Sequence, residues 1–223
     1  MRTFLLLCVL ITGLVVGLVA WHSHANLDSP AGNRERGISI EKLPVNFQTR
    51  TFDPSAPPAE MPPLKEGEEA VCDSDFVSTA SVGGETRKSM GEQATLTVNH
   101  IKVTLKLNIT IWTPIHATQH VQDHEEGHRE ISEYYYRTAD QVARQIAEPY
   151  IGRIVELNGS DLDAQSDRAL EKIASEITTE YGKELNTEPT QLLYDSITDH
   201  ARNDVSYKDA VAHALKNAAV EYR

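Results

Sequence analysis

The sequence His124-Glu125-Glu126-Gly127-His128 lies within a segment, 118–146, whose apolar residues recur at the spacing of an α-helix. Both histidines fall on the same stripe as those apolar residues, which are Val121, Ile131, Tyr135, Val142 and Ile146. Residues four apart on a helix lie one turn apart on one face, so the two imidazoles can reach one metal ion with Glu125 beside them. The stretch therefore predicts a long helix that carries two metal ligands on its buried face.

The segments around this helix show other periods. Apolar and polar residues alternate over 103–111, which predicts a half-buried strand, and 94–99 is expected to pair with it. The polar stretch 78–91 with Gly83-Gly84 is expected to be a loop. Helical patterns follow over 161–185, from Thr187 and from Ser206 to the C-terminus. We therefore expect an α+β fold of zincin-like type, with a small antiparallel sheet packed on a mainly helical body around a long HExxH helix.

The first residues have the pattern of an export signal. Arg2 precedes a largely apolar run, 4–20, and Ser23-His24-Ala25 offers a cleavage site with small residues at its ends. We expect a signal peptide over 1–25; the alternative is that 4–20 remains as an N-terminal membrane anchor. Under either interpretation the domain lies outside the cytoplasmic membrane and is secreted or periplasmic, because the positive charge precedes the apolar run.

Residues 26–70 contain seven of the ten prolines. Such a segment buries little apolar surface, so we expect an extended tether or a peptide wrapped on the surface of a metallopeptidase domain over 71–223. Two short apolar patches, at 38–40 and 45–47, could dock as strands.

Charge and cysteine content narrow the classes of partner. The formal net charge is −12, which disfavours nucleic acid and anionic membrane surfaces as partners. Cys8 lies in the predicted signal peptide, so Cys72 has no partner for a disulfide within the mature chain. We interpret Cys72 as a free thiol, and a thiolate ligand to zinc is the alternative.

A catalytic zinc ion needs three protein ligands and an open position for water, and HExxH provides two. The segment Tyr194-Asp195-Ser196-Ile197-Thr198-Asp199-His200 gathers a phenol, carboxylates and an imidazole near the end of a predicted helix. We favour His200 as the third ligand and Asp195 next. The remaining option is a glutamate of the helix predicted over 161–185, Glu176 or Glu180.

These motifs resemble the bacterial family of predicted secreted zinc-dependent proteases, whose detailed function is unknown. The family has an HE-x-GH core with an apolar residue three positions on, matched here by 124–131, and a later YD-x-x-T-x-HG segment. The second motif is matched by Tyr194, Asp195, Thr198 and His200, with Ala201 in the place of the glycine. The resemblance covers about 103–203, and the paired cysteines of the family are not found here. It implies a secreted zinc metalloprotease.

The predicted chemistry is hydrolysis of peptide bonds in a peptide or protein substrate. In this hypothesis His124 and His128 hold Zn²⁺, and Glu125 is the general base for a zinc-activated water. Tyr194, or another tyrosine or histidine near the cleft, is expected to stabilise the oxyanion. Asp195, where it is not a ligand, is expected to orient a ligating histidine. Two rivals remain: an envelope protein that keeps the zincin fold as a non-catalytic binding or structural module, and an interaction domain in which the motif is accidental.

Overall fold

The computed structural model describes residues 37–221, with side chains described as far as Ala218. The predicted signal peptide or anchor over 1–25, including Cys8, and the beginning of the predicted tether lie outside the described residues. Within the described part of the chain, no helix is both long and apolar enough to cross a membrane.

The sheet is built around one long strand, β4 (Gln93–Pro114), which pairs along both of its edges. One edge carries β3 (Val71–Lys88), which runs antiparallel to it. The other edge carries, in order along β4, the antiparallel β5 (Ile154–Asn158) and the parallel β1 (Gly37–Lys42) and β2 (Asn46–Phe52). The sheet is therefore mixed, and the prediction of a purely antiparallel sheet is wrong in this respect.

Strands β1 and β2 come from the segment predicted to be a tether. The chain from Gly37 to Phe52 runs in the direction of β4, and its register advances from His100 to Pro114. Ile38 and Ile40 are partly buried and pack against the main core. These few apolar side chains, together with parallel backbone pairing, hold the segment in the sheet, so the domain includes residues before the predicted boundary at 71.

An irregularity in β4 explains two further differences from the sequence-based expectations. The buried residues of β4 are even-numbered from Ala94 to Val98 and odd-numbered from Ile101 to Ile111, after which Trp112 is buried as well. The change coincides with a register shift at Gly83/Gly84 in β3, where Asn99 is the extra residue, as in a β-bulge. Residues 94–99 therefore continue the same strand instead of pairing with it.

The polar stretch 78–91, predicted to be a loop, belongs mostly to β3, which reaches Lys88. Its core-facing residues opposite β4 include the small side chains of Ser78 and Ala80, so the alternation of apolar and polar residues is weak there.

The HExxH helix is α1 (Gln119–Arg137), and it ends earlier than predicted. Thr138 interrupts the helical backbone, and α2 (Ala139–Ala147) follows, with a short 3₁₀ turn, η1 (Glu148–Tyr150), at its end. Lys42 of β1 donates to the carbonyl of Arg137 at 2.8 Å and pairs with Asp140 at 2.6 Å. The ammonium group of Lys42 thus satisfies carbonyls at the end of α1, which favours the end of this helix at Thr138.

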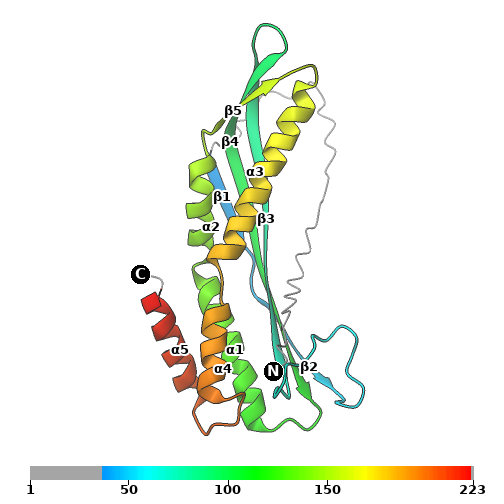
Figure 1. The fold of residues 1–223 in the computed structure, drawn as a ribbon, viewed down its shortest axis with the longest axis vertical. Helices are drawn as coiled ribbons and strands as arrows, with labels where there is room; N and C mark the ends of the chain where they lie inside the picture. Colours follow the sequence, from blue (N-terminus) through cyan, green and yellow to red (C-terminus); the bar gives the residue numbers. More distant parts are fainter. Residues whose placement is uncertain (1–36, 222–223) are drawn as a thin grey trace, which may run out of the picture. The chain divides into compact units, whose positions relative to one another are not determined.

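The remaining helices are α3 (Leu162–Glu184), α4 (Glu188–Thr198) and α5 (Tyr207–Glu221), close to the predicted positions. The main core lies between the sheet and helices α2 and α3, and it includes Val103, Leu105, Ile177 and Tyr181. A second cluster joins α1, α4 and α5 through Ile131, Tyr194 and Ala214. Figure 1 shows α1, α4 and α5 side by side, so that α4 faces the HExxH helix. The expected α+β class is confirmed.

Candidate metal centre

Helix α1 turns its motif toward the protein interior. Its first turn is capped by Thr118, whose hydroxyl accepts from the N–H of Val121 at 3.3 Å. His124 and Glu125 are 5% and 4% exposed, and Ile131 on the same face is fully buried. The predicted stripe is thus the buried face of the helix, and the two imidazole Nε2 atoms, of His124 and His128, lie 3.2 Å apart.

Asp195 of α4 completes a triangle with these imidazoles. Its Oδ1 atom lies 2.9 Å from Nε2 of His128 and 3.4 Å from Nε2 of His124. The side chain is 9% exposed, which means that the carboxylate is enclosed with the two imidazoles. Helix α4 presents this residue because it packs directly beside α1.

His200 approaches the same cluster from the turn after α4. Its Nδ1 lies 3.7 Å from Oδ1 of Asp195, and the donor atoms of His124, Asp195 and His200 all lie within 4.8 Å of one another. Asp199, His200 and Ala201 have φ values of 47°, 52° and 63°, a left-handed conformation that costs energy in residues other than glycine. The structure therefore brings together all four predicted ligands.

The donor atoms fit a metal ion. Three buried nitrogen or oxygen atoms of the cluster make no hydrogen bond among the described residues: Nδ1 of His124, Oδ1 of Asp195 and Nδ1 of His200. Buried polar atoms without partners are uncommon in proteins, and a shared cation would satisfy those that face it. Ligands at 2.0–2.2 Å in a tetrahedron are about 3.3–3.6 Å apart. The distances of 2.9, 3.2 and 3.4 Å among His124, His128 and Asp195, and of 3.7 Å between Asp195 and His200, lie around this range.

Gln191, which the sequence analysis missed, orients one of these ligands. Its Oε1 lies 2.6 Å from Nδ1 of His128, and its amide nitrogen donates to the carbonyl of His128 and to Oγ of Ser132. An N–H at Nδ1 that donates to Gln191 leaves the Nε2 lone pair of His128 directed at the cluster. Gln191 stands one helical turn before Asp195, and this spacing on one face was a signal that could have identified it.

Tyr194 packs behind the histidines. Its ring stacks on that of His124 with centroids 5.1 Å apart and meets that of His128 at 4.9 Å. The hydroxyl donates to the carbonyl of His124 at 3.0 Å, and a Cβ at Gly127 would lie only 2.1 Å from it. Gly127 is thus required by the close approach of Tyr194. Because this hydroxyl is fully buried and already engaged, its placement gives no support to the predicted oxyanion role.

Glu125 lies beside the cluster and against the start of β3. The backbone N–H of Cys72 donates to its carboxylate, and burial raises the pKa of Glu125 to about 7 against a smaller opposing effect of His128. Burial also opposes ionisation of Asp195, but the imidazoles of His124 and His128 outweigh it and hold the pKa of that carboxyl below its usual range. The cluster therefore contains one carboxylate suited to binding a cation and one that titrates near neutrality.

A narrow pocket touches both the cluster and Glu125. It is lined by α1, by the turn around His200 and by the last residues of the β2–β3 loop (53–70), with a volume of about 10 Å³. A single water molecule needs about this much space. Ala70 is 2% exposed, and the guanidinium of Arg202 lies where a Cβ on Gly67 would be. The β2–β3 loop thus contacts the turn around His200 and covers the pocket.

The other candidate ligands lie elsewhere. Glu176 pairs with Arg153 at 3.2 Å and Glu180 with Lys183 at 2.7 Å. Cys72 is not among the residues grouped around a possible metal ion, and burial raises the pKa of its thiol well above the usual range. The structure therefore gives no support to a glutamate of α3, or to the Cys72 thiolate, as a ligand.

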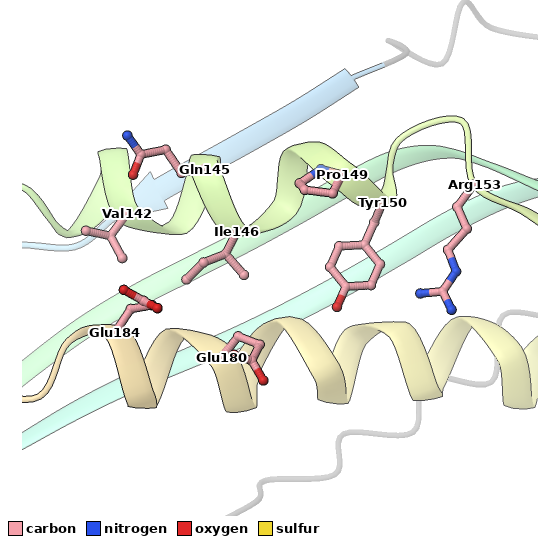
Figure 2. Close-up of a pocket in the computed structure, with 8 residues that line it drawn as sticks. All are labelled: Val142, Gln145, Ile146, Pro149, Tyr150, Arg153, Glu180 and Glu184. Atoms are coloured by element: carbon pink, nitrogen blue, oxygen red, sulfur yellow. The ribbon is translucent and has the colours of Figure 1, made fainter.

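A larger hollow of about 610 Å³ lies between α2 with η1 and α3 (Figure 2). Figure 2 shows Val142, Ile146 and Tyr150 on one side and Glu180 and Glu184 on the other. No histidine or cysteine lines it, and it shares no residue with the metal cluster. The donor atoms that could hold a metal ion lie instead around His124.

Comparison with protein-family models, curated proteins and solved structures found no match for this chain. The geometry of the cluster therefore carries the functional argument.

Proposed function

We propose that this protein is an exported zinc-dependent peptidase of zincin type that hydrolyses peptide bonds in a peptide or protein substrate. The observation that carries the proposal is the convergence of donor atoms of His124, His128 and Asp195 within 3.4 Å of one another, with Glu125 in the adjoining pocket. Export is inferred from the N-terminal sequence 1–25, which lies outside the described residues. Zinc is inferred from two imidazoles and a carboxylate, the ligand types that it takes in catalytic sites.

Each residue has a distinct task in this proposal. Zinc, when bound, supplies a Lewis acid that polarises water and a peptide carbonyl. His124, His128 and Asp195 hold the ion, and Gln191 fixes the ring of His128. Glu125 takes a proton from the attacking water and passes it to the nitrogen of the leaving amine. In the metal-free protein burial raises the pKa of Glu125 to about 7, so this carboxyl can bind and release a proton near neutral pH, as both transfers require.

The free edge of β3 supports a peptide as the substrate. Among the described residues β3 pairs only with β4, so its other edge has unpaired backbone groups. The N–H of Cys72 on that edge reaches Glu125, which places the edge next to the proposed base. An extended peptide could add to such an edge as a further strand and bring its carbonyl groups toward the cluster.

A second candidate function is a non-catalytic module in which the metal only stabilises the fold. The small volume of the pocket and the cover of the β2–β3 loop favour this alternative, since a peptide does not fit into about 10 Å³. Peptidase activity requires residues near Glu68 and Ala70 to move away from Glu125. The two candidates share the metal and differ in the need for Glu125.

The test compares the zinc-loaded wild type with Glu125→Gln on a mixture of unstructured peptides, with release of primary amines as the readout. The matched control is Glu130→Gln on the same helix. We expect Glu125→Gln to keep one zinc ion per chain and to lose about 10²–10⁴-fold in the rate of amine release. Glu130→Gln should keep both the zinc ion and the wild-type rate. Equal rates for Glu125→Gln and wild type would refute the peptidase and favour the non-catalytic module.

A further inference from the structure

His200 differs from the other three residues of the cluster in distance. The donor atoms of His124, His128 and Asp195 lie 2.9 to 3.4 Å apart. Nδ1 of His200 lies 3.7 Å from Oδ1 of Asp195. Three protein donors are the set that a catalytic zinc requires, and its fourth position stays open for substrate or water. His200 makes the longest of these contacts, although its donor atom still lies within 4.8 Å of those of His124 and Asp195.

His200 also differs in exposure and in what it borders. Its side chain is 28% exposed, compared with 6%, 15% and 9% for His124, His128 and Asp195. It lines the same narrow pocket as Glu125, which approaches from α1, while His200 approaches from the turn after α4. The imidazole and the carboxylate thus border one space, and a reacting carbonyl in that space would lie between them.

The backbone holds His200 in this position. The turn from Asp199 to Ala201 is left-handed throughout, and it is closed by hydrogen bonds from the N–H groups of Arg202 and Asn203 to the carbonyl of Thr198. Non-glycine residues in this conformation persist where the surrounding structure fixes them, and such sites are common around reactive centres. Nδ1 of His200 is buried and has no hydrogen-bond partner among the described residues, so it has a free donor or acceptor site.

We propose that His200 is a catalytic residue and not a zinc ligand: its ring N–H donates a hydrogen bond to the carbonyl oxygen of the scissile peptide bond as negative charge develops there. This inference rests on the proposed peptidase function. In the reaction the water oxygen bonds to the carbonyl carbon and the C–N bond breaks. Glu125 carries a proton from the water to the amine nitrogen, and His200 stabilises the oxygen without a net transfer of its own proton.

The test separates metal binding from catalysis. Zinc affinity is measured with zinc alone, by competition with a chromophoric chelator, for wild type, His200→Ala, His200→Asn and Asp195→Ala. Asparagine is included because it tolerates the left-handed conformation. The control is His116→Ala, an exposed histidine outside the cluster. Circular dichroism of the metal-free proteins verifies that each variant is folded.

We expect both His200 variants to bind zinc within about threefold of wild type and Asp195→Ala to bind it about a hundredfold more weakly or worse. On the peptide mixture, the His200 variants should lose about 10²–10³-fold in kcat with little change in KM, and His116→Ala should lose nothing. Loss of zinc affinity in both His200 variants, similar to that of Asp195→Ala, would make His200 a ligand and overturn the inference. An unchanged kcat would overturn it too.

Failure of this inference is distinguishable from failure of the proposed function. If wild type cleaves peptides and Glu125→Gln does not, the peptidase stands whatever His200 does. If Glu125→Gln is as active as wild type, the peptidase falls, and the catalytic role of His200 falls with it. The zinc-affinity measurement decides on His200 as a ligand in either case.

Discussion

Gly127→Ala tests the packing that supports the metal cluster. In an exposed helix this change is stabilising by about 1 kcal/mol, because alanine has the higher helix propensity. Here the new Cβ would lie 2.1 Å from the hydroxyl oxygen and 2.4 Å from Cζ of Tyr194. The Tyr194 ring is fully buried against the rings of His124 and His128, so it has little room to retreat.

The expected size follows from these contacts. Overpacking a buried site costs about 1–3 kcal/mol. Displacing the hydroxyl of Tyr194 from the carbonyl of His124 leaves this buried hydroxyl unpaired, at about 1–3 kcal/mol more. After the helix-propensity gain, Gly127→Ala should lower the free energy of unfolding by roughly 3 kcal/mol and the melting temperature by roughly 10 °C. Zinc affinity should fall as well, since Tyr194 backs both imidazoles.

The chain contains a matched control. Gly182 lies in α3, and a Cβ there would have no neighbour within 4 Å. Gly182→Ala should therefore raise stability by about 0.5–1 kcal/mol. Urea unfolding of both metal-free variants, followed by circular dichroism, measures the two effects. A Gly127→Ala protein as stable as Gly182→Ala would refute the close packing of Tyr194 on α1.

Three further outcomes are expected. Ala201→Gly should raise the free energy of unfolding by about 0.5–1 kcal/mol. Glycine removes the strain of the left-handed φ of 63°, and this gain exceeds the cost of the greater entropy of the unfolded chain. A lower stability of this variant in urea would contradict the expectation. The folded-state pKa of Glu125, about 7, lies above the ordinary value of 4.5, so deprotonation of this group lowers the stability of the chelator-treated protein as pH rises from about 4.5 through 7. Glu125→Gln should therefore exceed wild type in stability by on the order of 3 kcal/mol at pH 8 and by almost nothing at pH 4, and a difference that does not vary with pH between these values would contradict the burial of Glu125. Zinc at about a thousand times its dissociation constant should stabilise the wild type by about 4 kcal/mol and leave Asp195→Ala almost unchanged, as measured by thermal melting; equal shifts in the two proteins would place the ion elsewhere.

Local periodicity predicted the elements that carry the site. The stripe through His124 and Ile131 identified α1 and its buried face, and the helical pattern from Thr187 identified α4. These signals depend on residues close in sequence, so a single chain is enough to find them.

The arrangement of the sheet depends on contacts that local patterns do not contain. The parallel pairing of Ile38 with Ile101 joins residues far apart in the chain. The β-bulge at Asn99, where the buried face of β4 changes from even-numbered to odd-numbered residues, lies opposite Gly83 and Gly84 of another strand. The end of α1 at Thr138 depends in part on Lys42, almost a hundred residues earlier. Strand β5 was missed because Ile154–Asn158 is short and half exposed.

The sequence indicated which residues meet at the site, but not which of them lies closest to the two motif histidines. His200 was favoured as the third ligand because a histidine at a helix exit can reach across to a neighbouring helix. The side chain of Asp195 points from within α4 toward both motif histidines and lies closer to them. Gln191 and the packing of Gly127 under Tyr194 came only from the structure.

The most direct test of the metal centre is anomalous X-ray diffraction at the zinc edge from crystals of the protein grown with zinc. The account predicts one strong peak about 2.0–2.2 Å from Nε2 of His124, Nε2 of His128 and Oδ1 of Asp195. The absence of a peak among these three atoms in a protein that binds zinc stoichiometrically, or a peak held by other residues, would contradict it.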